Sequence, residues 1–80
     1  MAKQKAPPPT AGLLRLFVPG DIVEAQYDGA WRTVRLGFVL TGTPFVREAE
    51  ADPTTSDGYR EFGPDIAVPD DTMARLVRRR

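Results

Sequence analysis

The chain has 80 residues, contains no cysteine and no histidine, and has a formal net charge of zero. A chain of this length forms one domain at most, and such a domain buries only about 60% of the surface of its unfolded chain, which leaves little interior for a deep substrate pocket. The composition also excludes disulfides, thiolate metal sites and catalysis by a cysteine nucleophile or an imidazole base. We therefore expect a protein that is not an enzyme and that uses no metal and no cofactor.

Two features of the sequence bear on where the protein works. The first eleven residues lack the apolar stretch of a secretory signal, and no apolar run approaches the roughly 18 residues of a membrane span. These features predict a cytoplasmic protein without a membrane segment. Nine arginines against two lysines, with many small and proline residues, indicate a GC-rich genome and hence a bacterial or phage origin.

Charge is segregated along the chain. All eleven acidic residues lie between Asp21 and Asp71, where only four arginines oppose them, so this segment carries a formal charge of −7. The compensating cations lie in the flanking segments: Lys3, Lys5, Arg15, Arg75, Arg78, Arg79 and Arg80. The pattern is that of an acidic body with two basic ends.

The beginning of the chain is predicted to be a disordered arm over residues 1–11, which are polar and include three consecutive prolines. Residues 12–77 follow as the folded domain, and residues 78–80 as a basic C-terminal tail. The apolar stretch 12–18 is either a short strand or a turn of helix, and it stops at Pro19-Gly20, which is a turn signal.

Residues 22–27 and 30–40 are predicted to form a β-hairpin, because Asp28-Gly29 between two β-rich runs favours a two-residue turn with positive φ. This turn places Gln26 opposite Trp31. One face of the hairpin is then apolar and faces the core: Val23, Ala25, Tyr27, Val34, Leu36, Phe38 and Leu40. The other face is mixed and faces solvent: Ile22, Glu24, Gln26, Trp31, Thr33 and Arg35. Gly37 within the long second strand predicts a bend or a bulge.

Turn signals divide the rest of the chain into short elements. They predict a second turn over 41–44, a third strand over 45–51, a loop over 52–58, a fourth strand over 59–62 that ends at Gly63-Pro64, and an extension of the sheet over 66–68. The last segment leaves two alternatives open: a helix over 70–77, or a single helical turn over 69–74 followed by a closing strand over 75–78. Strands of this length and spacing favour a small all-β barrel.

The order of these signals resembles the Tudor branch of the SH3-like barrels. The resemblance rests on Gly20-Asp21-Ile22-Val23, on Tyr27 with Asp28-Gly29-Ala30-Trp31, on Tyr59-Arg60-Glu61-Phe62-Gly63, and on the segment 70–77. It implies a five-stranded SH3-like barrel with a short helical turn near the C-terminus and a flexible N-terminal arm.

The resemblance also implies a binding site. In Tudor domains an aromatic cage holds a methylated lysine or arginine by cation–π attraction, and the matching positions here are Tyr27, Tyr59 and Phe62. The residue after Trp31, which is often aromatic in the family, is Arg32 in this chain. A cation in the wall of the cage repels a cationic ligand, so this departure argues against the family's ligand.

The sequence thus predicts a non-catalytic interaction module that binds a protein partner through its barrel surface. The predicted contact residues are Trp31, Arg35, Tyr59, Phe62 and Tyr27, since exposed tryptophan and arginine are typical of binding hot spots. The acidic body favours a basic partner, and the edge of the strand 45–51 is a further place for a partner strand to pair. Self-association is also expected, through the basic tail of one copy on the acidic body of the next.

The alternative function is nucleic-acid binding through the basic ends. The residues that would contact phosphates are Arg75, Arg78, Arg79, Arg80, Lys3 and Lys5. Exposed aromatic side chains would add base stacking. The formal charge of −7 on the body opposes this alternative, because it repels the phosphate backbone.

Overall fold

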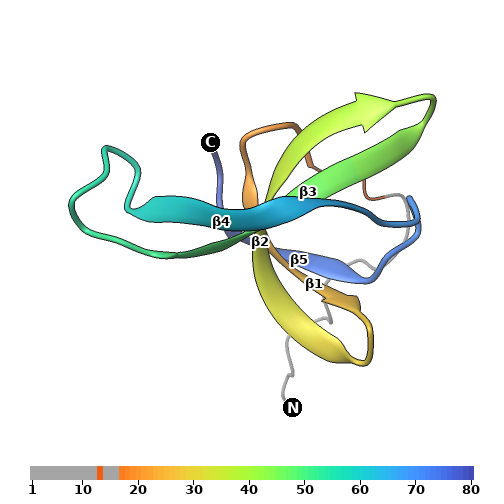
Figure 1. Cartoon of the computed structure of the whole chain (residues 1–80), viewed down its shortest axis with the longest axis horizontal. Coiled ribbons are helices and arrows are strands. Elements are labelled where there is room, and N and C mark those ends of the chain that lie inside the picture. Colours follow the sequence, from red (N-terminus) through yellow and green to blue (C-terminus); the bar gives the residue numbers. More distant parts are fainter. Residues whose placement is uncertain (1–12, 14–16) are drawn as a thin grey trace, which may run out of the picture.

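The computed structural model describes Leu13 and residues 17–80. Five strands follow one another along the chain: β1 (Ile22–Tyr27), β2 (Ala30–Leu40), β3 (Thr43–Ala51), β4 (Tyr59–Ala67) and β5 (Ala74–Arg78). They form one antiparallel sheet in the order β4-β3-β2-β1-β5 (Figure 1). The prediction of a small all-β fold with five strands is confirmed.

The sheet does not close into a barrel. Its two edges are β4 and β5, and these strands do not pair with each other in the described part of the chain. The prediction of a closed five-stranded barrel is therefore wrong in this respect. β3 lies between β2 and β4, so the expectation that its edge is open to a partner strand is also wrong.

The first hairpin has the predicted register. Tyr27 pairs with Ala30 and Gln26 with Trp31. Asp28 and Gly29 have φ angles of 53° and 77°, which is the left-handed pair that a two-residue hairpin turn requires. This local chemistry fixes which side chains of β1 and β2 lie on each face.

β2 and β3 form a second hairpin with the same kind of turn. Thr41 and Gly42 have φ angles of 51° and 78°, and Leu40 pairs with Thr43. The register shifts between Leu36 and Val39, which confirms the bulge predicted at Gly37. A Cβ atom at Gly37 would lie only 3.1 Å from the carbonyl oxygen of Phe45, so the bulge brings two backbones close together.

β4 is longer than the sequence predicts. It does not end at Gly63-Pro64 but continues to Ala67. The register shifts on the way: Phe62 pairs with Glu48, whereas Ile66 pairs with Val46. Gly63 has a φ angle of 79°. Glycine and proline therefore mark a bulge in an edge strand, which is one of the few places in a sheet where proline is tolerated.

The end of the chain forms a turn and a strand. The backbone N–H of Thr72 donates to the carbonyl of Pro69 at 3.0 Å, and β5 then pairs with β1, with Ala74 opposite Ala25 and Arg75 opposite Glu24. No helix occurs within residues 17–80, so both the helix over 70–77 and the helical turn over 69–74 are wrong. The closing strand of the second alternative is present. Among the described residues, no helix has the length and apolarity needed to cross a bilayer.

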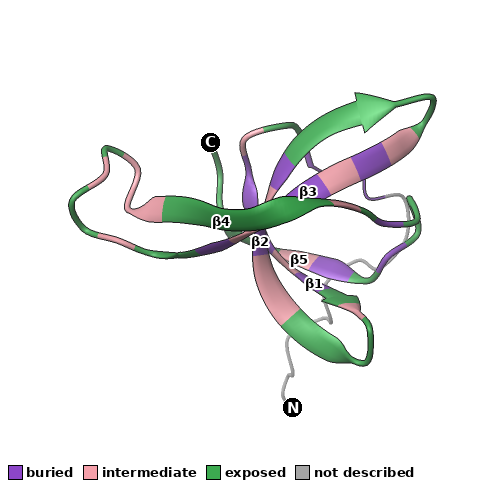
Figure 2. Ribbon diagram, viewed as in Figure 1, coloured by how far each residue is buried: buried purple, intermediate pink, exposed green. Residues whose placement is uncertain are grey.

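The core lies on one face of the sheet. Its buried members are Leu13, Phe17, Val23, Ala25, Val34, Leu36, Val46, Val68 and Ala74. Figure 2 shows the buried positions near the centre, where the strands cross, and exposed positions toward the ends of the hairpins. Leu13 is buried in this core, and its N–H donates to the carbonyl of Asp70 at 2.6 Å.

Three positions depart from the predicted faces of the first hairpin. Phe38 and Leu40 were expected in the core but are exposed. The bulge near Gly37 shifts the register by one residue, so that Val39 pairs with Pro44 and Phe38 and Leu40 turn to the face opposite the core. Ile22 was expected to face solvent but is buried. It lies opposite Arg35, whose ion pairs lie on the same face of the sheet.

Candidate functional site

Trp31 is the largest exposed aromatic side chain on the face of the sheet opposite the core. It retains 37% of its accessible surface. The register of β1, β2 and β5 places Glu24, Thr33 and Arg75 on the same face. Met73, just before β5, is also exposed, and its carbonyl accepts a hydrogen bond from the N–H of Gln26 at 2.8 Å. We call Glu24, Trp31, Met73 and Arg75 the Trp31 patch.

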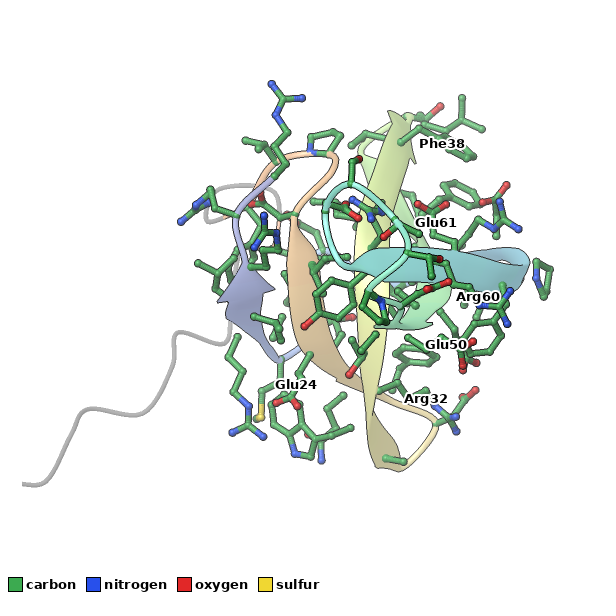
Figure 3. The ribbon with its side chains drawn as sticks, turned by 90° about the vertical axis from the view of Figure 1, so that its left-hand side faces the viewer. Glu24, Arg32, Phe38, Glu50, Arg60 and Glu61 are labelled. Atoms are coloured by element: carbon green, nitrogen blue, oxygen red, sulfur yellow. The ribbon has the colours of Figure 1, made fainter. Side chains whose placement is uncertain are left out.

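Within the Trp31 patch, the tryptophan ring is held in place by a cation. The guanidinium carbon of Arg75 lies 4.1 Å from the centroid of the Trp31 ring, within the range of cation–π attraction. Arg75 is fixed in turn, because its Nε donates to Glu24 Oε1 at 2.8 Å. Figure 3 shows Glu24 near one end of the sheet and Phe38 near the opposite end. The patch is thus a partly exposed tryptophan stacked against a guanidinium that is itself paired with a carboxylate.

Arg35 lies on the same face but in a different setting. Its side chain is only 17% exposed. Nη1 donates to the carbonyl of Gly20 at 2.9 Å, Nη2 pairs with Asp57 at 2.5 Å, and Nε pairs with Glu61 at 2.5 Å. The guanidinium therefore joins the chain before β1, the loop 52–58 and β4. The Arg35 side chain thus links three elements of the fold, and little of its surface is accessible for contact with another molecule.

The loop 52–58 is ordered by its two carboxylates. Asp52 accepts hydrogen bonds from the N–H and the hydroxyl of Thr54, and these bonds lower the pKa of the Asp52 carboxyl, the hydroxyl contributing most. The hydrogen bond from Arg35, followed by that from the N–H of Tyr59, lowers the pKa of the Asp57 carboxyl. Both carboxyls therefore bind protons less readily in the folded chain than in the unfolded chain.

The lowered pKa of Asp57 predicts a loss of stability in acid. A carboxyl with a lower pKa in the folded state contributes stability that is present above its ordinary pKa of 3.8 and disappears as the pH falls through the folded value. We expect the melting temperature to decline as the pH falls below about 4, and we expect a smaller decline in the variant Asp57→Asn. Melting curves from pH 7 to pH 2.5 measure both. Equal declines in the two proteins would show that Asp57 is not the responsible group.

The three rings of the expected aromatic cage are not brought together. Tyr27 lies on the core face, where the guanidinium carbon of Arg32 stands 5.3 Å from its ring centroid. Phe62 pairs with Glu48 and Tyr59 with Ala51, so Phe62 and Tyr59 lie on opposite faces of β4 by the alternation of a strand. The guanidinium of Arg32, from the same chain, thus covers the face of the Tyr27 ring that a cationic ligand would contact. Burial, and after it the nearby carboxylate of Glu48, raise the pKa of the Tyr27 hydroxyl.

The predicted nucleic-acid residues are partly engaged with the body. Arg75 is bound to Glu24, and Arg79 Nη1 lies 3.0 Å from Asp21 Oδ2. The backbone N–H of Arg80 donates to Asp21 Oδ1 at 2.9 Å. Arg78 forms no ion pair within residues 17–80. Lys3 and Lys5 lie outside the described residues.

Sequence reasoning missed Glu24, Met73 and the stacked position of Arg75. Glu24 and Arg75 are 51 residues apart in the chain, and only the pairing of β1 with β5 brings them together. Their opposite charges would have signalled a contact only if that strand order had been known. The two apolar hairpin residues Val39 and Leu40 were likewise placed in a strand without being recognised as exposed.

The described residues contain no group of three or more acidic side chains arranged to hold a metal ion. A comparison of the chain with models of protein families finds no match, and neither does a comparison with curated proteins or with solved structures.

Proposed function

We propose that the protein is a non-catalytic interaction module that binds another protein through the Trp31 patch. The observation that carries this proposal is the stacking of Arg75 on Trp31 with Glu24 fixing the arginine. Tryptophan and arginine are the residues most enriched in binding hot spots. A ring whose rotamer is already fixed loses less conformational entropy when a partner covers it.

The charges around the patch favour a basic partner. Asp28 lies in the turn that leads to Trp31, and Asp71 lies shortly before Met73; both are exposed. Asp28 forms no ion pair with the described residues. Carboxylates at the rim of an apolar contact steer an approaching cationic surface and raise its association rate.

We also propose that the fold is related to the SH3-like barrels, as a sheet that does not close into a barrel. Support comes from the path of the chain, in which four consecutive strands form a meander and β5 returns to pair with β1. Support for binding on the sheet surface rather than in a cavity comes from the shortness of the chain. The methyl-ligand function of the Tudor branch is not part of the proposal, because Arg32 lies over the ring of Tyr27.

The variant Trp31→Ala tests the proposal. We expect binding of a protein partner, captured with the wild-type chain and then titrated, to weaken by about 30-fold or more, as for a hot-spot residue. The melting temperature should fall by only about 4 to 8 °C, because the ring is partly exposed and its cation–π contact stabilises by about 1 kcal/mol.

Phe62→Ala is the matched control, because Phe62 is exposed to a similar extent but lies on the opposite face of the sheet. It should leave binding unchanged. Equal losses in both variants would place the contact elsewhere. An amide NMR titration with duplex DNA at low salt and at about 0.3 M salt tests the alternative. Shifts of the Trp31 patch that persist at the higher salt would replace protein binding by nucleic-acid binding.

A further inference from the structure

The far end of β2 has an open edge. β1 pairs with β2 only over the residues from Ala30 to Arg35, and the last backbone contacts on that side join Leu36 to Gly20 and Asp21. β2 itself continues to Leu40. Within the part of the chain that the structure describes, the last residues of β2 therefore have a neighbouring strand only on the β3 side.

The backbone of Val39 points toward this open edge. Val39 pairs with Pro44, and the carbonyl of Pro44 accepts a hydrogen bond from Val68 on the side away from β2. The pair Val39–Pro44 is therefore one of the pairs in an antiparallel ladder that exchange no hydrogen bonds, and the N–H and C=O of Val39 face outward. An outward donor and acceptor on one residue form a place where another strand can add.

The side chains at this edge are apolar and uncharged. Phe38, Val39 and Leu40 are exposed by 45%, 41% and 59%, and Phe38 stacks on Phe45 with ring centroids 4.6 Å apart. No charged residue occurs in the eleven residues 36–46, although 28% of the whole chain is charged. Three consecutive exposed apolar residues in a strand are unusual unless they are covered by a partner.

We propose that this edge pairs with the same edge of a second copy, in an antiparallel arrangement about a two-fold axis at Val39. Around such an axis the N–H of each Val39 donates to the carbonyl of the other, and Phe38 of one copy lies beside Leu40 of the other. An uncharged edge offers no electrostatic attraction to a positively or negatively charged partner strand. Two identical uncharged segments, in contrast, meet without electrostatic repulsion. The formal net charge of zero removes repulsion between whole copies as well.

This dimer is independent of the proposed binding site. Val39 and Trp31 are eight residues apart on β2, which corresponds to roughly 26 Å along a strand. The edge is also short, so the proposed contact is expected to bury less than the roughly 1,200 Å² of stable interfaces. A weak dimer that forms at high protein concentration and carries two free Trp31 patches is the expected species. Two patches on one particle strengthen binding to a repeated partner through effective concentration.

Charge substitutions at Val39 test this arrangement. Sedimentation velocity over a wide concentration range is expected to show a reversible monomer–dimer equilibrium for the wild-type chain. Val39→Lys and Val39→Glu, which place like charges opposite each other across the axis, should each weaken the dimer at least tenfold. An equimolar mixture of the two variants should restore it as a heterodimer. Ser56→Lys, in the exposed loop 52–58, adds the same charge elsewhere and should leave the equilibrium unchanged.

Amide hydrogen exchange gives a second measurement on the unmodified chain. The exchange of the Val39 amide should slow as the protein concentration rises, while that of Leu40, which flanks the turn and pairs with Thr43, should not change. A wild-type chain that stays monomeric at millimolar concentration would overturn the inference, and so would Val39→Lys dimers as strong as those of the wild type. Loss of the dimer in Trp31→Ala would assign self-association to the Trp31 patch instead.

Discussion

Replacing Asp21 with alanine is expected to lower the free energy of unfolding by about 3 kcal/mol and the melting temperature by roughly 12 to 24 °C. The carboxyl group of Asp21 is fully buried, with 0% exposure. It accepts hydrogen bonds from the N–H of Val18 at 3.0 Å, from Arg79 Nη1 at 3.0 Å and from the N–H of Arg80 at 2.9 Å. Removing the acceptor leaves two backbone donors without partners and releases the end of the chain from the start of β1.

Circular dichroism during urea unfolding measures this loss. Asp65→Ala removes an exposed carboxylate that forms no ion pair with the described residues, and it should change stability by less than about 0.5 kcal/mol. Arg79→Ala should cost less than Asp21→Ala, because the Arg79 side chain is mostly exposed and solvent replaces its contact. If Asp21→Ala were no less stable than Asp65→Ala, the buried carboxylate would not hold the chain end.

The local features of the fold were predictable because they follow from residues adjacent in the chain. Asp28-Gly29 tolerates the two positive φ angles of a two-residue turn, and that turn determines the register of the whole first hairpin. The same register placed Trp31 on the face away from the core, where it is indeed partly exposed. Gly37 marked the bulge for a similar local reason.

The remaining features depend on contacts between distant parts of the chain. Gly63-Pro64 is typical of the end of a strand when only neighbouring residues are considered. Pairing with β3 nevertheless extends β4 beyond these two residues. The exposure of Phe38 and Leu40 depends on the one-residue shift in register between β2 and β3, which the apolar alternation of β2 alone does not reveal. Closure of the sheet depends on the path of β4 relative to β5, and this is a property of twist and bulges rather than of any motif.

Charge segregation was recognised in the sequence, but its structural role was not. The sequence predicts that the C-terminal arginines bind nucleic acid or a second copy of the chain. In the structure Arg75 and Arg79 reach carboxylates of β1 and of the residue before it, Glu24 and Asp21. Pairing β5 with β1 brings the basic end of the chain beside the acidic body, so part of the segregated charge is neutralised within one molecule.

Replacing Arg35 with alanine is the second substitution with a large expected effect. The predicted role of Arg35 is the same as that of Trp31, but its guanidinium donates hydrogen bonds to Gly20 and Asp57 and forms an ion pair with Glu61, in three different segments. Hydrogen bonds to charged partners stabilise by about 1.5 to 3 kcal/mol, and partial exposure of the two carboxylates reduces this contribution. We expect Arg35→Ala to lower the free energy of unfolding by about 2 kcal/mol. Urea unfolding measures the change.

Arg60→Ala is the control for this substitution. Arg60 is also an arginine that pairs with two carboxylates, Glu50 and Asp52, but its side chain is 56% exposed, so its loss should cost less than about 1 kcal/mol. Arg35→Lys should recover only part of the stability, because one ammonium group cannot match the planar guanidinium that donates to Gly20 and Asp57 and pairs with Glu61. A variant Arg35→Ala that keeps wild-type stability but loses partner binding would show that Arg35 belongs to the contact surface and not to the scaffold.

We expect instead that Arg35→Ala loses stability and that Trp31→Ala loses only binding. This result would show that the scaffold and the contact surface are separate sets of residues on one face of the sheet.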